Sequence, residues 1–538
     1  MPHHLIEENP TAAAEDTTAA LVRALDNSVA FGHPLRDLRV LETHISWVIL
    51  TGDYAYKIKK PVNFGFLDFS TLYKRFFYCR EELRLNRRFA PQIYLDLVEV
   101  RGSQDAPRLH GDGEVIEYAL KMIEFPQHCL LSHYAASGTL DATHIDAIAV
   151  RVNGLHADSA GRGDCDTESD NEYGTARVAQ RWSEENMTHI ANTIPAALLP
   201  ESYARLRHWY RDNRELLRDI DQRKRDGYVR ECHGDLHLGN MAMIEGEVTA
   251  FDCIEFNPEL RWIDTISEAA FVAMDLHARG YPAYCWRFIN RYLEISADYE
   301  AVKLLRYYFI YRALVRAKVE ALQVEHSVDA SANDVAAFKP ALDYIELADQ
   351  WASRHRAALI VMHGLSGSGK STVAAQLVEA LGAIQIRSDV MRKQLFDIDL
   401  DASSGSGLDD GIYRSDASAL TYRKLEQVAA TIIAADYCVI VDATFLREAQ
   451  RRQMLELKSA KPYARIVVVC DAPEAVLRKR IEERENDPSE ANLQVLEQQI
   501  HKREPISEEE ARLASIVRIG ADGIDSSQID RIRTLLRT

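Results

Sequence analysis

Strand-like and helix-like spacings of apolar residues alternate in the first quarter of the chain. Four short apolar runs predict strands: Ile45–Leu50, Tyr54–Ile58, Ile93–Val100 and Val115–Ile123. Between the second and third runs, apolar positions recur with helical spacing over about Thr71–Arg88, with Ser70 as the candidate N-cap. Strands around one helix predict a small, mostly antiparallel lobe over about 18–124, preceded by a flexible tail over 1–17.

Helical spacing dominates from about residue 125 to residue 355. The expected helices are Asp141–His156, Glu184–Ile190, Glu201–Ile220, Asp264–Leu322 and Asn333–His355. A loop rich in Ser, Gly, Asp and Glu is expected over 158–175, and short strands and turns are expected over Cys232–Asn257. The pattern predicts a helical lobe over about 125–345, followed by a helical junction over 346–356.

From Ala357 onward, apolar strands alternate regularly with helices. The expected strands are Leu359–Met362, Ile384–Ile386, Cys438–Val441 and Ile466–Cys470. Strands that alternate with helices in this way predict a parallel sheet with helices on both faces. We therefore expect an α/β domain over 357–538.

The first of these strands leads into a complete G-x-x-x-x-G-K-[ST] pattern. Its eight residues are Gly364, Leu365, Ser366, Gly367, Ser368, Gly369, Lys370 and Ser371. Strand, glycine-rich loop and helix are the setting of a P-loop, whose backbone N–H groups and helix N-terminus bind phosphates. Lys370 is expected to reach the β- and γ-phosphates of ATP, and Ser371 to bind Mg²⁺. A chance Gly/Ser loop, the alternative, does not account for eight matching positions with both flanks.

Composition and charge narrow the functional classes. The chain has 538 residues, 47% of them hydrophobic and 27% charged, which fits a globular protein of two to four domains. No run approaches 18 uninterrupted apolar residues and the polar N-terminus lacks the apolar part of a secretory signal, so no membrane partner is expected. The eight cysteines show neither C-x-x-C nor zinc-ligand spacing, which favours reduced thiols in the cytoplasm. The net charge of −18 argues against nucleic acid as the main partner.

A second group of polar residues lies in the run H-G-D-L-H-L-G-N, residues 233–240. Asn240 follows Asp235 by five positions, and Asp252 comes later at the end of an apolar run. This is the layout of phosphoryl transfer in protein kinases. There the first Asp accepts the proton of the attacking hydroxyl, while the Asn and the second Asp bind Mg²⁺. A surface turn rich in Asp and His is the alternative.

This run resembles the catalytic loop of the aminoglycoside phosphotransferase family, a branch of the kinase-like fold. The resemblance implies that Asp235 is the catalytic Asp and that Asn240 and Asp252 bind Mg²⁺. Two departures from the family pattern remove no ligand. Leu238 stands where the family often has Pro, and the second Asp is not followed by Phe-Gly.

A kinase-like fold also needs a strand lysine and a helix glutamate in its first lobe. Lys57 is the expected lysine, because Ala55 stands two residues before it as in V-A-I-K; Lys59 on the same strand face is the alternative. Glu82 is the expected glutamate, preferred to the adjacent Glu81. The loop before this strand lacks a glycine-rich phosphate cover, as aminoglycoside phosphotransferase-like enzymes commonly do.

Two strand ends in the α/β part carry carboxylates. Asp389 follows the strand at 384–386, and Asp442 follows the strand at 438–441. In small-molecule P-loop kinases, an Asp at the first place faces the acceptor hydroxyl. The second place is that of a Walker B carboxylate, close to Mg²⁺. A helix N-cap is the alternative for either residue.

Arginines gather on a later helical stretch, 476–484. Arg480 and Arg484 share a helix face and precede a polar segment, 485–490, so we expect a lid that brings them to the transferring phosphoryl group. A solvated helix with ion pairs between residues four apart is the alternative. Residues 357–505 resemble P-loop kinases such as gluconate kinase, the zeta toxins and the polynucleotide kinase domain.

Both halves together resemble a family of fused aminoglycoside phosphotransferase-like and AAA-type ATP-binding proteins. Three stretches carry this resemblance: Tyr56–Val62, Phe64–Phe69 and Asp442–Leu446. It covers nearly the whole chain and implies an α+β kinase-like two-lobed domain over 18–345, followed by the α/β P-loop domain.

The leading interpretation is a cytoplasmic enzyme with two ATP and Mg²⁺ sites that transfers the γ-phosphoryl of ATP to hydroxyls of small molecules. A second interpretation is one catalytic kinase domain regulated by nucleotide binding at the other. A third is a 5′-hydroxyl polynucleotide kinase in the C-terminal half. That half holds 24 Lys and Arg against 28 Asp and Glu, a balance that disfavours an extended nucleic-acid track.

Overall fold

The chain forms two compact units, each built from several segments. The computed structural model describes residues 12–65, 67–159, 172–325, 335–353, 357–400, 402, 412, 414–483 and 492–536. The first unit comprises Met1–Leu140, Leu155–Val178 and Arg223–Glu268. The second comprises Asp141–Gly154, Ala179–Gln222 and Ala269–Thr538. The domain limits expected from the sequence stay predictions.

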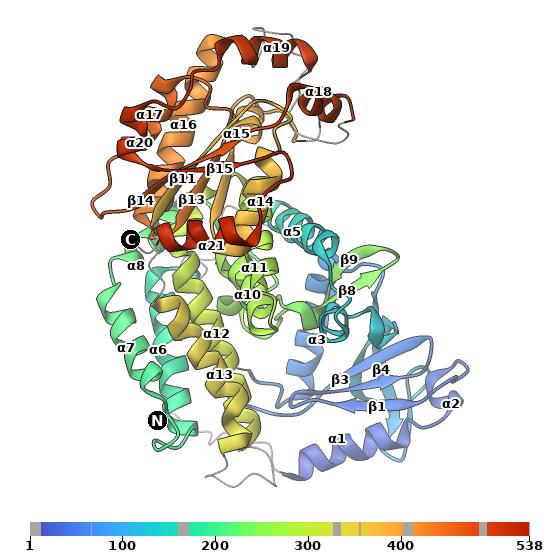
Figure 1. Cartoon of the computed structure of the whole chain (residues 1–538). Coiled ribbons are helices and arrows are strands. Elements are labelled where there is room, and N and C mark those ends of the chain that lie inside the picture. Colours follow the sequence, from blue (N-terminus) through green and yellow to red (C-terminus); the bar gives the residue numbers. More distant parts are fainter. Residues whose placement is uncertain are drawn as a thin grey trace. The chain divides into compact units, whose positions relative to one another are not determined.

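A six-stranded antiparallel sheet with the order β1-β2-β3-β6-β4-β5 is the main layer of the first unit. Its strands are β1 (Arg39–Glu42), β2 (Ser46–Leu50), β3 (Tyr54–Lys59), β4 (Tyr94–Ser103), β5 (Ala106–Arg108) and β6 (Val115–Ile123). Helix α3 (Leu72–Phe89) packs against β4 and β6 (Figure 1). The small antiparallel lobe expected from the sequence is confirmed.

The two faces of strand β3 pack in different cores, because successive side chains of a strand point to opposite faces. Tyr56 and Ile58 are fully buried in a core that includes Leu21 of α1 (Ala12–Ala24) and Leu25, which follows this helix. Ala55, on the other face, packs in a second core with residues of α3, β4 and β6. Lys57 and Lys59 share that second face, so both lysines point toward α3.

Helix α3 begins one residue later than the sequence pattern indicates. Thr71, not Ser70, is the N-cap, and its hydroxyl accepts the N–H of Lys74 at 3.2 Å. The hydroxyl of Ser70 instead donates to the carboxylate of Asp68 at 2.6 Å. The expected N-cap was wrong because a neighbouring carboxylate takes the serine hydroxyl.

Short elements before and after the sheet complete the first unit. They are α2 (Ser28–Phe31), η1 (Gln127–Cys129), α4 (Leu131–Ser137), β7 (Val229–Glu231), η4 (Leu238–Asn240), β8 (Met241–Ile244), β9 (Glu247–Ala250), α9 (Pro258–Arg261) and β10 (Trp262–Asp264). Strands β8 and β9 form a hairpin, and β10 pairs with β7. The run at 233–240 therefore lies between two small two-stranded ladders.

Two of the helices expected between the sheets, Glu201–Ile220 and Asp264–Leu322, are divided into shorter ones, whereas the helix expected at Glu184–Ile190 is longer than predicted. The helices between the sheets are α5 (Ala142–Ala157), α6 (Ala176–Thr193), α7 (Glu201–Asp212), α8 (Leu216–Arg225), α10 (Thr265–Ala278), α11 (Pro282–Ser296), η5 (Tyr299–Ala301), α12 (Val302–Glu325) and α13 (Val335–Ala352). The continuous helix expected over Asp264–Leu322 was wrong. Gly280 with φ +88° and Pro282 separate α10 from α11, and Ala297 with φ +56° ends α11.

A five-stranded parallel sheet with the order β12-β13-β11-β14-β15 forms the C-terminal part of the second unit. Its strands are β11 (Ala358–His363), β12 (Ile384–Arg387), β13 (Cys438–Asp442), β14 (Ala464–Cys470) and β15 (Ser515–Ile519). Its helices are α14 (Lys370–Leu381), α15 (Ser388–Leu395), α16 (Ser415–Ala434), α17 (Glu448–Leu455), α18 (Glu474–Glu482), α19 (Leu493–Lys502), α20 (Glu508–Leu513) and α21 (Ser526–Leu535). Figure 1 shows α14 and α21 on one face of the sheet and α16, α17 and α20 on the other. The expected α/β architecture is confirmed.

Among the described helices, none combines the length and the apolar character that crossing a bilayer requires.

Candidate functional site

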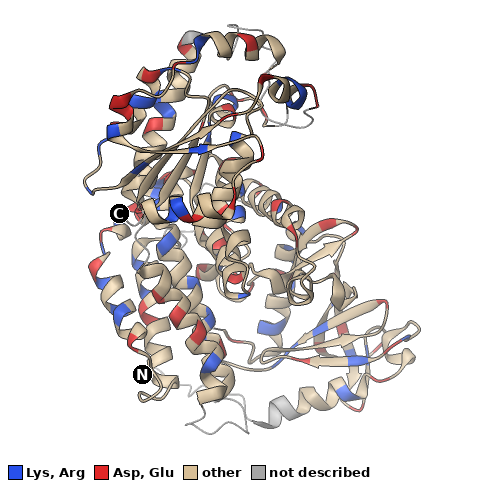
Figure 2. Ribbon diagram, in the orientation of Figure 1, with Lys and Arg blue, Asp and Glu red and all other residues tan. Residues whose placement is uncertain are grey.

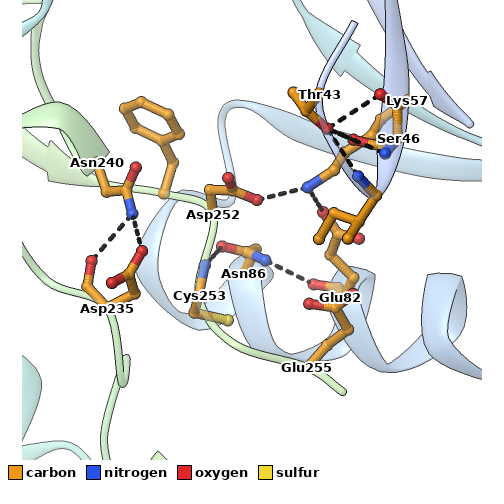
Figure 3. Close-up of polar contacts among 12 residues, drawn as sticks. Thr43, Ser46, Lys57, Glu82, Asn86, Asp235, Asn240, Asp252, Cys253 and Glu255 are labelled. Atoms are coloured by element: carbon orange, nitrogen blue, oxygen red, sulfur yellow. Dashed lines mark hydrogen bonds and ion pairs between the residues drawn. The ribbon is translucent and has the colours of Figure 1, made fainter. Parts of the chain in front are cut away.

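Lys57 of β3 lies between two carboxylates in the first unit. Its Nζ donates to Glu82 Oε1 at 2.8 Å and to Asp252 Oδ1 at 2.5 Å (Figure 3). The side chain of Lys57 is 11% exposed and that of Glu82 is fully buried. Buried charges are stable only when they are paired, so these contacts hold the lysine ammonium in place. The structure brings three of the predicted site residues together.

Electrostatics keep this cluster ionised. Burial disfavours the ammonium of Lys57, but the carboxylates of Asp252 and Glu82 outweigh it and raise the pKa of Lys57 well above its usual value. Burial likewise opposes the charge on Glu82, yet the neighbouring lysines lower its pKa to about 2. The site therefore presents a permanent cation at neutral pH.

The loop at 233–240 positions a second group of polar side chains. Asn240 Nδ2 donates to Asp235 Oδ2 at 3.0 Å and to the Asp235 carbonyl at 2.9 Å. His233, which is fully buried, donates from Nε2 to the Phe251 carbonyl at 2.8 Å. Burial lowers the pKa of His233, which favours the neutral ring. The loop is thus tied to the segment that carries Asp252.

The buried carboxylate of Glu268, which the sequence analysis did not identify, holds the loop at 233–240 in place. Glu268 Oε1 accepts the N–H of Gly234 at 2.7 Å, and its Oε2 lies 3.0 Å from His156 Nε2. Burial opposes the charge of Glu268, but these partners outweigh it and lower its pKa. The sequence holds no short-range signal for this contact, because Gly234 and Glu268 are far apart in the chain.

Asp252 has an unusual backbone conformation for a residue with a side chain. Its φ is +62°, in the left-handed region, and its N–H donates to the hydroxyl of Tyr94 at 3.0 Å. The next residue, Cys253, donates its N–H to Asn86 of α3 at 3.1 Å. The Asp252 side chain remains 45% exposed. This conformation gives the carboxylate access both to Lys57 and to solvent.

The two halves of the first site meet around Asp252. Figure 3 shows Asp235 with Asn240 on one side of Asp252, and Lys57 with Glu82 on the other. An amide oxygen and carboxylates are the donor set that Mg²⁺ prefers. Asn240 and Asp252 therefore carry the kinds of oxygen that would hold Mg²⁺, and the ammonium of Lys57 suits a phosphate group.

The glycine-rich loop of the second unit joins β11 to α14 in the geometry of a P-loop. A Cβ on Gly364 would lie 2.4 Å from the carbonyl oxygen of Cys470, so only glycine fits there. Gly369 takes φ +87° immediately before α14. Lys370 Nζ donates to the Leu365 carbonyl at 2.8 Å, and the buried Ser368 Oγ has no hydrogen-bond partner among the described residues. A loop with an unsatisfied hydroxyl next to a helix N-terminus and a lysine fits a phosphate group.

Two predicted carboxylates lie at the carboxyl ends of neighbouring strands. Asp442 is the last residue of β13 and accepts Gln385 Nε2 at 3.0 Å. Asp389 lies in the first turn of α15, 3.5 Å from Arg392. The N-cap alternative was wrong for both, since Arg387 and Arg447 occupy the N-cap positions of α15 and α17.

The expected arginine lid is described only in part. Arg480 donates to the carbonyl oxygens of Gly367 at 3.3 Å and of Ala521 at 2.7 Å. This places its guanidinium against the P-loop backbone. Arg478 pairs with Glu474 and Glu497 on the exposed side of α18. Arg484 lies outside the described residues, and the catalytic role of either lid arginine stays a prediction.

A family model matches the C-terminal part of the chain, and two mycobacterial proteins match most of its length. Residues 359–506 match the model of a family described as "AAA domain". The uncharacterized protein Rv2004c of Mycobacterium tuberculosis is 30% identical over 471 residues, which cover 86% of this chain and 90% of that protein. The corresponding protein Mb2027c of Mycobacterium bovis matches with the same values.

Two solved structures match the chain with low similarity. A choline/ethanolamine kinase family protein from Mesorhizobium loti covers 63% of this chain and 95% of its own, with 12% identity and a TM-score of 0.38. A sugar kinase from Janibacter sp. HTCC2649 covers 34% of this chain and 95% of its own, with 19% identity and a TM-score of 0.27.

The fold and the two groups of site residues define an ATP-dependent phosphotransferase, with a kinase-like part followed by a P-loop kinase domain. Within that class, the chain belongs to the same family as the uncharacterized mycobacterial proteins Rv2004c and Mb2027c. The expected combination of a kinase-like part and a P-loop domain is confirmed by the two sheets and by the family model matched over 359–506.

Proposed function

We propose that the chain is a two-site enzyme that transfers the γ-phosphoryl of ATP to hydroxyls of small molecules. The observation that carries the proposal is the pairing of Lys57 with both Glu82 and Asp252. In a kinase-like lobe, a lysine held in this way contacts the phosphates of the nucleotide. The P-loop at 364–371, with Lys370 and the nearby Asp442, supports a second and separate nucleotide site.

At the first site, we expect the carboxylate of Asp235 to accept the proton of the acceptor hydroxyl. The amide of Asn240, which donates to this carboxylate at 3.0 Å, fixes its orientation. The oxygens of Asn240 and Asp252 would hold Mg²⁺, which when bound offsets charge on the transferring group. Lys57 holds the phosphates, so the chain positions both reactants.

At the second site, the backbone N–H groups of the P-loop and the ammonium of Lys370 would bind the phosphates. Ser371 and Asp442 would hold Mg²⁺. Asp389, at the carboxyl end of the neighbouring strand β12, would face the acceptor hydroxyl. Arg480 would support the P-loop through its bond to the Gly367 carbonyl.

Small molecules in the cytoplasm are the proposed partners. Lys and Arg are interspersed with Asp and Glu along the described helices of the C-terminal part (Figure 2), which does not favour a nucleic-acid track and so speaks against polynucleotide kinase activity. The seven cysteines in the described ranges are all free of disulfides, as is typical of reducing compartments.

A second candidate function is a regulatory one, in which one site acts on the other. Within the second unit, hydrogen bonds lead from Asn290 of α11 to Gln385 and from there to Asp442, so that a shift of α11 would move the Asp442 carboxylate. This gives the second site a means of control by its own helices.

The test is ATP turnover against a panel of sugars, amino alcohols, nucleosides and 5′-hydroxyl oligonucleotides. It compares the wild type with Asp235→Ala and Lys370→Ala. We expect each variant to abolish a different transfer activity. If neither variant changes any transfer, the two-site proposal is wrong. If only Lys370→Ala matters, the first site is a binding module, and dependence of one product on both residues indicates coupled steps.

A further inference from the structure

Two further side chains, Lys59 and Glu255, extend the contact between Lys57 and Glu82 into the protein interior. Glu82 Oε1 accepts Lys57 Nζ at 2.8 Å, and Glu82 Oε2 accepts Lys59 Nζ at 2.6 Å. Lys59 in turn donates to Glu255. With Asp252 at the outer end, the order is Glu255, Lys59, Glu82, Lys57 and Asp252. Figure 3 shows the outer part of this order, Glu82, Lys57 and Asp252.

We propose that Lys59 and Glu255 are positioning residues for the first phosphotransfer site. Lys59 occupies the second oxygen of Glu82, so that only one oxygen is available to Lys57, and Glu255 holds Lys59 in that position. The inference rests on the proposed function of that site, since it assumes that Lys57 contacts phosphate.

Burial shows that Lys59 acts through Glu82 and not through a ligand. Its side chain is 2% exposed, against 11% for Lys57 and 45% for Asp252. Its Nζ also lies 4.6 Å from the centre of the Phe69 ring, which closes its remaining side. A nucleotide would therefore meet Lys57 and Asp252, and would not reach Lys59.

The geometry follows from three chain segments with fixed spacing. Lys57 and Lys59 are two residues apart on one face of β3. Asp252 and Glu255 are three residues apart on the segment after β9. Glu82 of α3 lies between the two lysines. Each lysine therefore joins Glu82 of α3 to a carboxylate on the segment that carries Asp252. When one lysine is removed, the other lysine can change its contacts with Glu82.

Loss of Lys59 would redirect Lys57. Glu82 is fully buried, and its Oε2 would have no cation. The flexible ammonium of Lys57 could then bond both oxygens of Glu82, because a buried carboxylate without a partner is strongly unfavourable. Lys57 would move inward from Asp252 and from the phosphate position. The expected result is weaker nucleotide binding and slower transfer without loss of a ligand-contacting residue.

The test uses the full chain with Lys370→Met, so that nucleotide signals report the first site. Lys59→Met is measured for ATP affinity by a fluorescent ATP analogue, for the ATP-induced rise in Tm, and for KM and kcat. We expect the Kd and the KM for ATP to rise at least roughly tenfold, with a fall in kcat. Lys59→Arg, which keeps the charge, should recover most of the affinity.

Two further variants keep the test decisive. Lys59→Met with Glu255→Gln removes one charge of each sign, which preserves the balance of the cluster and favours folding. Lys60→Met is the matched control, because Lys60 is also buried but pairs with Glu42, outside the cluster. The proposal is overturned if the folded double variant binds ATP like the Lys60→Met control.

Lys57→Met separates this inference from the proposed function. If Lys57→Met weakens ATP binding and Lys59→Met does not, the first site is a nucleotide site and the positioning role is wrong. If Lys57→Met also leaves ATP binding unchanged, the proposed function of the first site fails and the inference is overturned with it.

Discussion

The side chain of Asn290 bonds the backbone of the edge strand β12 at Gln385. Asn290 Oδ1 accepts the Gln385 N–H at 2.6 Å, and Asn290 Nδ2 donates to the Ala383 carbonyl at 2.9 Å. The Gln385 side chain then donates to Asp442 at 3.0 Å. A residue of α11 thus takes the place of a strand partner at the edge of the parallel sheet, and it is two hydrogen bonds from the Asp442 carboxylate.

Replacing Asn290 should disturb the second site from a distance. Asn290→Ala leaves the Gln385 N–H and the Ala383 carbonyl without this partner, which costs about 1–3 kcal/mol of folding free energy. We expect a lower Tm and a reduced rate at the second site, measured by ATP turnover in an Asp235→Ala background. Asn290→Asp keeps the acceptor for Gln385 and should lie between wild type and alanine. Unchanged turnover in Asn290→Ala would exclude the link to Asp442.

The catalytic loop should depend on Glu268 without loss of nucleotide affinity. Glu268→Gln weakens a charge-assisted bond to the Gly234 N–H, a loss that corresponds to roughly a tenfold fall in kcat at the first site. The Kd for ATP should stay close to wild type, because Lys57 and Asp252 are untouched. Equal changes in Kd and kcat would show that Glu268 supports the whole lobe instead.

The buried ring of His363 should make the P-loop domain less stable in acid. The ring is buried at the end of β11 and bonds the Phe445 carbonyl at 3.0 Å. Burial, then the charges of Arg451 and Arg503, lower its pKa to about 4. Because the folded state favours the neutral ring, His363 stabilises the folded state above about pH 6.5. This stabilisation is lost as the pH falls toward 4, and the loss in the free energy of unfolding is up to about 3 kcal/mol.

The measurement is the Tm of wild type and His363→Gln across this pH range. The wild type should lose more stability than the variant between pH 6.5 and pH 4, since glutamine does not titrate. Parallel curves would assign the acid sensitivity to other groups.

A fully buried ion pair should dominate the stability of the same domain. Arg451 Nε and one terminal nitrogen bond the two oxygens of Glu510 at 2.6 and 3.0 Å, and both side chains are 0% exposed. Arg451→Met leaves Glu510 without its cation, which should cost about 3–5 kcal/mol in denaturant unfolding. Arg451→Met with Glu510→Met should recover much of the loss, and no recovery would show that the backbone bonds of Arg451 matter more.

The local motifs of the first site could be predicted from the sequence, but its supporting contacts could not. The spacing from Ala55 to Lys57 indicated the lysine, and the structure pairs Lys57 with Glu82, while Glu81 pairs with Arg84 near the surface. Glu255 carries no such signal, because its partner Lys59 is distant in sequence and meets it only after β3 and the 252–255 segment pack together.

The spacing of apolar residues also fails to show where a helix ends when the end is caused by backbone conformation at Gly or Pro. The run from Asp264 to Leu322 keeps apolar spacing throughout, yet Gly280 and Pro282 interrupt it. These two residues were the available signal. Such a break matters here because it sets the direction of α11 and hence the contact of Asn290 with β12.

The left-handed backbone of Asp252 constrains how this protein can lose activity by mutation. At φ +62°, Asn and Gly are tolerated, whereas Ala or Val would add roughly 1–2 kcal/mol of strain. Asp252→Asn therefore removes the charge without backbone strain, and an alanine scan at this position mixes two effects. A change of Asp252 to Asn or Gly therefore alters the charge at this position without adding backbone strain, so the fold does not protect the carboxylate from being lost.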